Sequence, residues 1–370
     1  MERRSAIRSQ QFVHRVAGAV PLQWMAQPTS PWRYLIRTYN FCVVGFGNVG
    51  KAFVALLRKK EQELRQRYGI GWRLSGIASR RLGWLVAPGG FTAEKLLGGD
   101  FSQAQTVKDV NEWLRLGKAD ALLEVSSLNA ATGQPATDYV RAALDAGAHA
   151  ITANKGPVLH AWHELTALAA TRNRRFLHES AMMDGVPIFS LFRETLPAIE
   201  VRGFRGVLNS TTTVVLDAMA AGLTFDDAVR EAQRLGVAET DPANDVDGID
   251  AAVKIVGLTT VLMNGSLKLA DVRLQGIRDI GTKQLRDAQA SGEVWRLVSR
   301  ARRESGAISA LVAPERLKAG DPLSTVRGTS LLISFETDIF PELIIGERDP
   351  GPQATAYGLL ADFISAVRSK

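Results

Sequence analysis

The alternation of apolar and polar positions predicts a strand, a helix and a second strand early in the chain. An apolar run at Tyr39–Val44 reads as a buried strand, and a helical pattern continues after the following glycines to about Tyr68. A second apolar run, Trp72–Ala78, reads as the next strand. Two strands joined by a helix form a βαβ unit, in which the strands run parallel.

The alternation continues as far as residue 154. Asp120–Val125 and His149–Ala153 read as buried strands, and Pro135–Ala146 between them reads as a helix that ends at Gly147. Strands that alternate with helices predict a parallel sheet covered by helices on both faces. We therefore expect an α/β domain over residues 38–154.

Beyond residue 154 the elements follow one another less regularly, as in an α+β domain. We expect a second domain over residues 155–340 and a C-terminal segment, 341–370, that returns to the first domain. The strands expected there are Arg175–His178, Val201–Leu208, Ile308–Ala313, Thr329–Phe335 and Leu343–Gly346, and the helices are Trp162–Thr171, Val214–Ala221, Phe225–Leu235, Ile249–Met263 and Thr355–Val367.

A glycine turn separates the first predicted strand from its helix. Gly45, Gly47 and Gly50 are spaced as G-x-G-x-x-G, with Asn48 and Val49 before the last glycine. In that motif the glycines permit a tight turn, close approach of a pyrophosphate and packing of the helix on the strand. The free N–H groups of the helix N-terminus then face the phosphates. This context predicts a Rossmann-type dinucleotide-binding domain with these five residues at the cofactor; a structural glycine turn is the alternative.

The residues at the carboxyl ends of the strands bear on the choice of cofactor. An acidic residue after the second strand would bind the ribose 2′-OH of NAD, but the chain has Ser79, Arg80 and Arg81 there. Guanidinium groups suit the 2′-phosphate of NADP. We predict NADP, with NAD as the alternative, and expect Ser79, Arg80, Ser126 and Ser127 beside the cofactor. Solvated loop arginines and serine hydroxyls buried in a turn are the competing interpretations.

The net charge of +7 does not indicate a nucleic-acid partner, because the charge is concentrated at one end. Residues 1–37 carry six arginines and one acidic residue, a net +5, which leaves +2 for the other 333 residues. We expect this basic extension to be disordered or to follow an upstream start codon; an organelle transit peptide is the alternative. The single cysteine, Cys42, indicates no disulfide framework, and no apolar run approaches the ~20 residues of a membrane span. We expect a cytoplasmic protein without a membrane partner.

Candidate chemistry is densest between residues 232 and 254. Five carboxylates lie within twelve positions: Glu239, Asp241, Asp245, Asp247 and Asp250. On the predicted helix Asp250 and Lys254 stand at i and i+4, so they share a face and can pair. An ordinary surface pair is the alternative. Asp245 and Asp247 before Gly248 match part of a calcium loop, but no glutamate closes it, and a turn with an N-cap explains the same residues.

This segment resembles the signature of homoserine dehydrogenases, with matching spacing throughout. Three further motifs occur in the family's order: Thr152–Pro157 resembles the domain junction, Gly185–Ile188 the motif after it, and Gly206–Thr212 the Asn-Gly-Thr turn. The resemblance covers about Tyr39 to the C-terminus. Ser210 departs from it, because the family usually has glycine there. This leaves open a related amino-acid dehydrogenase with another substrate. A nucleotide-sensing protein that retains the fold without turnover is a separate alternative.

The resemblance implies interconversion of L-homoserine and L-aspartate 4-semialdehyde with a nicotinamide cofactor, at the branch toward threonine and methionine. A lysine can move the hydroxyl proton if burial or a second lysine lowers its pKa. By similarity, Lys254 is the acid/base, and Lys155 polarises the carbonyl or shares the proton beside the cofactor. Asp250 and Glu239 would hold the hydroxyl and ammonium groups of the amino acid, with Asp245 also at the substrate. Spacing does not decide which lysine transfers the proton.

The resemblance also implies a monovalent cation such as sodium in the segment Glu179–Val186. Its expected ligands are one carboxylate and backbone carbonyls at Glu179, Met182, Asp184 and Val186; an ordinary loop is the alternative. We further expect residues 155–340 to bind substrate and to form a homodimer. The chain resembles the short form of the family, without a C-terminal regulatory domain.

Overall fold

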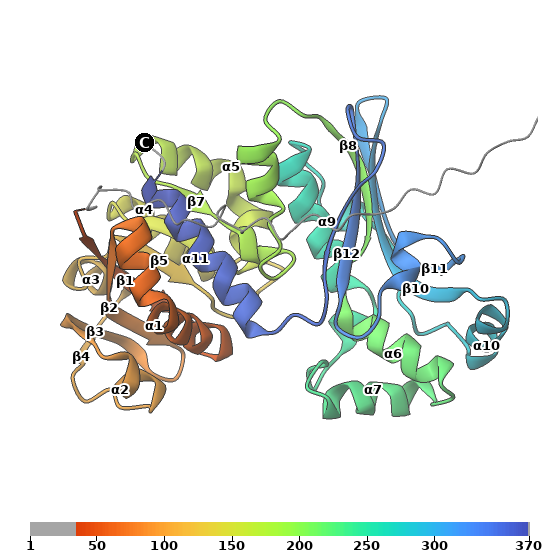
Figure 1. Cartoon of the computed structure of the whole chain (residues 1–370), viewed down its shortest axis with the longest axis horizontal. Helices are drawn as coiled ribbons and strands as arrows, with labels where there is room; N and C mark the ends of the chain where they lie inside the picture. The colour runs from red at the N-terminus through yellow and green to blue at the C-terminus, as the bar shows by residue number, and fades with distance from the viewer. Residues whose placement is uncertain (1–34, 369–370) are drawn as a thin grey trace, which may run out of the picture.

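The computed structural model of the protein describes residues 35–368. The predicted basic extension, residues 1–37, therefore lies almost entirely outside the described residues. Two β-sheets stand side by side (Figure 1). Within residues 35–368, no helix combines the length and apolar character that crossing a membrane requires.

The first sheet has seven strands in the order β4-β3-β2-β1-β5-β6-β7. The strands β2, β1, β5, β6 and β7 are parallel, and β3 and β4 extend the sheet antiparallel. The strands are β1 (Arg37–Val44), β2 (Ile70–Ser79), β3 (Gly83–Phe91), β4 (Gln105–Val107), β5 (Ala121–Glu124), β6 (His149–Thr152) and β7 (Phe176–Leu177). The helices around them are α1 (Asn48–Tyr68), α2 (Ala93–Leu97), α3 (Val110–Leu116), α4 (Ala136–Asp145), α5 (Lys155–Thr171) and α11 (Pro352–Arg368).

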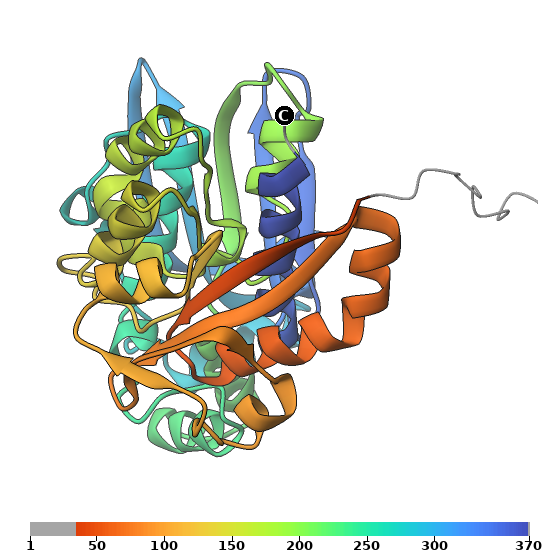
Figure 2. The same ribbon diagram turned by 90° about the vertical axis from the view of Figure 1, so that its left-hand side faces the viewer.

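Successive residues of β1 pack into different cores on the two faces of this sheet. Cys42 packs in the core that includes residues of α4 and α5, whereas Phe41 packs with residues of α1 and α11. The Phe41 ring meets Phe53 of α1 and Phe363 of α11 edge to face, at centroid distances of 5.7 and 4.6 Å. Figure 2 shows α4 and α5 on one side of the sheet and α1 on the other. The C-terminal helix thus completes a sheet that begins more than 300 residues earlier in the chain.

The second sheet has six strands in the order β13-β12-β8-β10-β11-β9. These are β8 (Val201–Val207), β9 (Arg273–Leu274), β10 (Val294–Glu304), β11 (Ala307–Leu317), β12 (Leu331–Thr337) and β13 (Leu343–Glu347). The helices are α6 (Ser210–Ala220), α7 (Phe225–Arg234), α8 (Ala243–Val246), α9 (Ile249–Leu262) and α10 (Thr282–Ala290). Single helical turns occur at Glu179–Ala181, Leu191–Thr195, Leu269–Asp271 and Pro322–Thr325. The predicted fold class, a Rossmann-type sheet with an α+β domain, is confirmed.

The start of α5 differs from the sequence prediction, which placed this helix at Trp162. The helix begins at Lys155, because the Asn154 side chain accepts a hydrogen bond from the N–H of Gly156 and caps it. Pro157 is tolerated because it lies in the first turn, where a missing N–H breaks no helical hydrogen bond. The helix then kinks at Ala161, where φ is −144°. Gly156 and Pro157 are therefore part of the helix, and Lys155 occupies its first position.

Candidate functional site

Lys254 lies in a helix that is buried on nearly every side. All residues of α9 from Ala251 to Thr260 are buried, and Lys254 itself is 9% exposed. Its ammonium donates to the carbonyl of Leu208 and lies 3.1 Å from Asp250 Oδ2. The i, i+4 pair expected from the sequence is therefore present, and it lies in the interior of the protein.

Asp250 also contacts the second lysine. Lys155 Nζ, at the start of α5, lies 3.3 Å from Asp250 Oδ1, so each carboxylate oxygen faces one ammonium group. Burial disfavours the charged form of Asp250, but Lys254 and Lys155 outweigh this effect and lower the pKa of its carboxyl. The group remains ionised and holds two amines, 99 positions apart in the chain, at one point.

Asn209 joins the acidic segment to this cluster. Its Nδ2 donates to Asp245 Oδ1 at 2.7 Å and to Asp250 Oδ2 at 3.0 Å, while its Oδ1 accepts the N–H of Thr212 at 2.9 Å and caps α6. Burial and the neighbouring Asp250 raise the pKa of Asp245, and the bond from Asn209 partly offsets the shift. Asn209 was not among the predicted site residues, although an Asn ahead of a helix start is a recognisable N-cap signal.

The predicted substrate residue Glu239 lies apart from this cluster. It is exposed in the loop between α7 and α8, where its backbone carbonyl accepts a hydrogen bond from Gln233 Nε2. Within residues 35–368 no hydrogen bond or ion pair of its carboxylate is found. The structure brings together Lys155, Asp245, Asp250 and Lys254, and leaves Glu239 at the surface.

The glycine turn has the shape that a phosphate cradle requires. Gly45 has φ +97°, and a Cβ there would lie 2.3 Å from the backbone of Val125. A Cβ on Gly50 would lie 2.9 Å from the carbonyl oxygen of Gly45, whereas one on Gly47 would meet nothing within 4 Å. The turn is tightly packed at its first and third glycines and open at the second, where a ligand can approach the backbone. Asn48 is exposed beside this opening, and Val49 is half-buried.

The side chains expected around the cofactor divide into two groups. Arg80 Nη2 donates to Ser127 Oγ at 3.3 Å, so the guanidinium bridges the ends of β2 and β5 at the surface. Ser79 Oγ instead accepts the N–H of Leu82, and Ser126 Oγ donates to the buried Glu124. Arg80 and Ser127 are exposed and can contact a ligand. The hydroxyls of Ser79 and Ser126 instead form hydrogen bonds within the turns that contain them.

The predicted cation loop has two carboxylates, Glu179 and Asp184, and a third, Glu347 at the end of β13, lies beside it. Both oxygens of Glu179 accept backbone N–H bonds, from Phe189 at 2.6 Å and Ser190 at 2.7 Å. Glu347 lies against Asp184, and within residues 35–368 its buried Oε1 has no hydrogen-bond partner. Burial and Asp184 raise the pKa of Glu347 to about 8. Among residues 35–368 no cluster of three or more His, Cys, Asp or Glu side chains is suited to a metal. A cation here therefore fits only with backbone carbonyls and these carboxylate oxygens as ligands.

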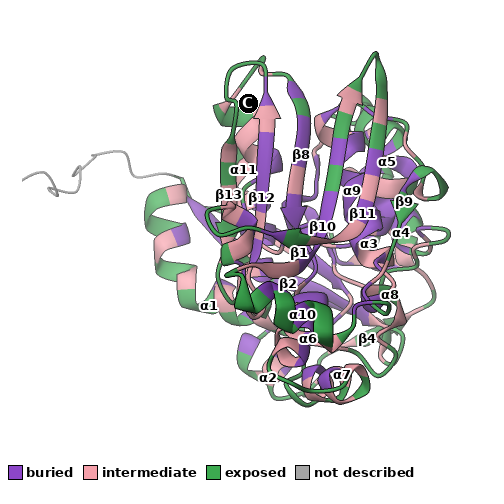
Figure 3. Ribbon diagram, turned by 90° about the vertical axis from the view of Figure 1, so that its right-hand side faces the viewer, coloured by how far each residue is buried: buried purple, intermediate pink, exposed green. Residues whose placement is uncertain are grey.

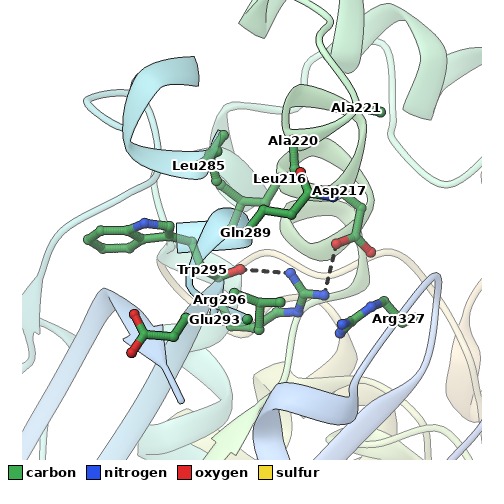
Figure 4. A pocket seen from close by; sticks show the side chains of 12 residues that line it. Leu216, Asp217, Ala220, Ala221, Leu285, Gln289, Glu293, Trp295, Arg296 and Arg327 are labelled. Atoms are coloured by element: carbon green, nitrogen blue, oxygen red, sulfur yellow. Dashed lines mark hydrogen bonds and ion pairs between the residues drawn. The ribbon is translucent and has the colours of Figure 1, made fainter. Parts of the chain in front are cut away.

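A separate cavity of about 370 Å³ lies between α6, α10 and the start of β10 (Figure 4). Its floor holds Arg296, which is 1% exposed and pairs with Asp217 at 2.8 Å. The guanidinium also donates to the carbonyls of Val326 and Trp295. These bonds satisfy the guanidinium within the chain, so the arrangement clamps β10 to α6.

Comparison with known proteins identifies the family to which this chain is similar. The profile described as "Homoserine dehydrogenase" matches residues 187–364, and "Homoserine dehydrogenase, NAD binding domain" matches residues 45–179. The NAD(+)-dependent homoserine dehydrogenase of Pseudomonas canavaninivorans is 33% identical over 90% of this chain and 97% of its own. A putative homoserine dehydrogenase structure from Archaeoglobus fulgidus superposes with TM-score 0.78 at 28% identity, covering 88% of this chain and 98% of that one. A hyperthermophilic archaeal homoserine dehydrogenase mutant in complex with NADPH gives TM-score 0.76 at 28% identity, covering 90% and 98%. The family expected from the motifs is confirmed: the chain belongs to the homoserine dehydrogenases.

Proposed function

We propose that the protein interconverts L-homoserine and L-aspartate 4-semialdehyde with a nicotinamide cofactor, and that the lysine pair performs the proton chemistry. The observation that supports these roles is the position of Asp250 between Lys155 and Lys254. Lys155 directly follows Asn154, whose amide donates to the carbonyls of Ser126 and Ser127. That turn packs against Gly45, so the lysine pair lies close to the cradle proposed for the cofactor.

The chemistry assigns a task to each group. A bound nicotinamide would supply hydride transfer at the carbon that carries the hydroxyl of homoserine, and the glycine turn with Arg80 would hold the cofactor. For the oxidation of homoserine, Lys254 must first release a proton to solvent, and its neutral amine then takes the hydroxyl proton as the carbonyl forms; in the reduction its ammonium gives that proton to the oxygen. Lys155 lies opposite and stabilises negative charge on the same oxygen. Asp250 holds both ammonium groups in place, and Asp245 offers a carboxylate oxygen to the ammonium group of the substrate.

Glu239 keeps its proposed substrate role, although it lies apart from the cluster. Its loop would have to close over a bound amino acid to bring the carboxylate to the ammonium group. The exposure of Glu239 and of much of its loop supports such a movement.

We propose NADP as the preferred cofactor, on the strength of Arg80. The guanidinium stands after β2, and among the described residues it bonds to the neutral hydroxyl of Ser127, so its charge is available to a 2′-phosphate. The related proteins are divided, since one is named NAD(+)-dependent and another forms a complex with NADPH. Arg80→Ala should raise the KM for NADP about tenfold or more, with the KM for NAD unchanged. Arg81→Ala is the control, and an equal effect of Arg80→Ala on both cofactors would contradict the assignment.

The cation remains a proposal for residues 179–186. The carbonyls of Met182 and Val186 would act with Asp184, whose Oδ1 already accepts the hydroxyl of Thr355 at 2.8 Å. The unpartnered oxygen of Glu347 supports this site, because a bound cation would satisfy it. Sodium should raise the melting temperature of the free protein above that in tetramethylammonium at equal ionic strength, and Glu347→Gln should reduce the difference.

The domain division and the homodimer are also proposals. We assign residues 38–154 to the cofactor and residues 155–340 to substrate and partner, with 341–370 returning to the first sheet. The second sheet offers a surface for the partner on the face opposite α6 and α9. In Figure 3 strands β8, β10, β11 and β12 face the viewer there. The apolar side chains on that face that are half-buried or exposed include Leu311, Ala313, Leu332 and Ile344.

The decisive experiment measures formation of reduced nicotinamide by absorbance, with the full chain, L-homoserine and either NADP or NAD. Oxidation of L-homoserine supports the proposal. Ser210 stands at the start of α6 next to Asn209, so other amino-acid alcohols belong in the panel. A faster reaction with one of them would indicate a related dehydrogenase, and cofactor binding without turnover on any of them a nucleotide-sensing protein.

A further inference from the structure

Glu124, the last residue of β5, is an acidic side chain in the interior of the protein. It is 0% exposed, and within residues 35–368 no lysine, arginine or histidine forms an ion pair with it. Burial raises the pKa of this carboxyl, and hydrogen bonds from Ser126 and Thr152 partly offset the shift. A polar group buried at such a cost needs a structural or functional reason.

The two oxygens of Glu124 hold two different strand ends. Oε1 accepts the N–H of Ser126 at 2.9 Å and its hydroxyl at 2.5 Å, which fixes the turn that follows β5. Oε2 accepts the hydroxyl of Thr152, the last residue of β6, at 2.7 Å. One rigid carboxylate therefore sets the distance between the ends of these neighbouring strands.

A second set of bonds carries this constraint to Lys155. Thr152 Oγ1 accepts the N–H of Asn154 at 2.9 Å, and Asn154 Nδ2 donates back to the carbonyl of Ser126 at 3.1 Å. Asn154 Oδ1 caps α5, whose first residue is Lys155. The bonds form a closed ring from Glu124 through Thr152 and Asn154 to the Ser126 turn. That turn is the one against which Gly45 packs without room for a Cβ.

We propose that Glu124 is a positioning residue that sets the place of Lys155 relative to the turn Ser126–Ser127 and the glycine cradle beside it. This inference rests on the proposed function for its effect on turnover, but its effect on cofactor binding is independent of the substrate. A carboxylate suits the position because it accepts three hydrogen bonds on two oxygens and donates none when ionised. A misplacement of about 1 Å between reacting groups lowers rates by on the order of 100-fold.

The test compares Glu124→Ala and Glu124→Gln with the parent chain by melting temperature, cofactor Kd and kcat. Alanine removes all three bonds, and we expect cofactor Kd to rise and kcat to fall by about 10- to 100-fold each. Glutamine keeps one acceptor oxygen for the two bonds from Ser126, so it should restore most of the cofactor affinity but less of kcat. If the alanine variant does not fold, the glutamine variant carries the test alone.

The matched control is Ser75→Ala on β2, which is separated from β5 by β1 in the same sheet. Ser75 is also 0% exposed, and its hydroxyl donates to the carbonyl of Phe41 in the sheet, away from the two turns. Its loss should lower the melting temperature while Kd and kcat stay unchanged. If the Glu124 variants behave in the same way, Glu124 is structural only and the inference is overturned.

A double-mutant cycle with Asn154→Ala separates positioning through the ring from an independent effect. If Glu124 acts on Lys155 through Asn154, the double variant loses no more kcat than the worse single variant. If the fold loss of kcat in the double variant equals the product of the losses in the two single variants, the inference is overturned. If the parent chain binds NADP but does not oxidise L-homoserine, the proposed function fails, and the Kd measurements still decide whether Glu124 shapes the cradle.

Discussion

At the scale of single residues, Asn209 combines two tasks that separate side chains often perform. One end of its amide caps α6 through the N–H of Thr212, and the other end holds Asp245 and Asp250 together. Two carboxylates this close repel each other, and the shared NH₂ group reduces that repulsion. The stability of a helix and the charge distribution of the site therefore depend on the same side chain.

Asn209→Ala should affect both stability and turnover. Loss of the cap should lower the free energy of unfolding by about 1 kcal/mol, and release of the two carboxylates should lower kcat by about 10- to 100-fold. The control is Thr224→Ala, because Thr224 caps α7 in the same way, through the N–H of Asp227. Thr224→Ala should lower the free energy of unfolding by a similar amount and leave kcat unchanged. Equal kcat values for both variants would show that the contacts of Asn209 with the acids do not matter for catalysis.

Lys254→Ala tests the assigned proton transfer. Removal of the amine should lower kcat by about 100- to 10,000-fold, whereas cofactor Kd should change by less than about twofold. Single-turnover absorbance and cofactor titration measure the two quantities. Lys283→Ala on the exposed face of α10 is the control. Turnover close to that of the parent chain would refute the role of Lys254.

At the scale of elements, the sequence predicted the helices and strands with a clear apolar period. It missed strands whose charged side chains are paired by residues on other strands. The strand β10 was not predicted, because Arg300 and Arg302 interrupt its apolar residues. Both arginines are matched across the sheet, by Glu315 on β11 and Glu336 on β12. This information lies in other strands, outside any local window of sequence. The strands β3 and β4 at one end of the first sheet were missed as well. Glycines and a proline divide the segment of β3 from 83 to 91, and β4 has only three residues.

Prediction of the candidate site from the sequence was limited in the same way, because its contacts join distant segments of the chain. The i, i+4 spacing was enough to predict the pairing of Asp250 with Lys254. A role for Lys155 in the same site was implied by family resemblance alone, and its contact with Asp250 was not predicted, because no local pattern relates positions 155 and 250. Glu124 was not identified, since a single glutamate at the end of an apolar strand has no distinctive sequence signal. Long-range hydrogen bonds define these roles, and a sequence read locally does not contain them.

The edge formed by β6 and β7 should make stability depend on pH. His149 Nδ1 accepts the N–H of Arg175 at 3.1 Å. Burial, with Arg174 and Arg175, lowers the pKa of His149 to about 4. A histidine with a depressed pKa stabilises the fold above its unfolded value of about 6.5, and this contribution is lost as pH falls from there toward 4.

Thermal or urea unfolding between pH 7 and 4 should therefore separate His149→Gln from the parent chain. The parent should lose on the order of 1–2 kcal/mol more than the variant across that interval, because its unfolded state takes up a proton that its folded state resists. His163→Gln, on an exposed part of α5, is the control. Parallel pH curves for the parent chain and His149→Gln would contradict the expectation.

At the scale of the whole molecule, the open face of the second sheet should set the oligomeric state. Light scattering should give a mass of twice the 40.2 kDa of the chain. Leu332→Glu places a charge on that face and should shift the protein toward the monomer, with the melting temperature measured alongside. A parent mass of one chain would contradict the homodimer, and a dimeric Leu332→Glu would place the contact elsewhere.

The return of α11 to the first sheet has a practical consequence for handling the protein. Arg368, at the end of this helix, lies over the ring of Tyr68 at 5.3 Å, so the last described turn sits at the far end of α1. Both ends of the described chain thus pack on the first sheet and its helices. The segment that forms the second sheet lies between them in the sequence. An affinity tag or fluorophore attached after residue 370 should report on the α1 side and leave the proposed partner surface unobstructed. Truncation within α11 would expose the Phe41 core, so trimming from this end should be avoided.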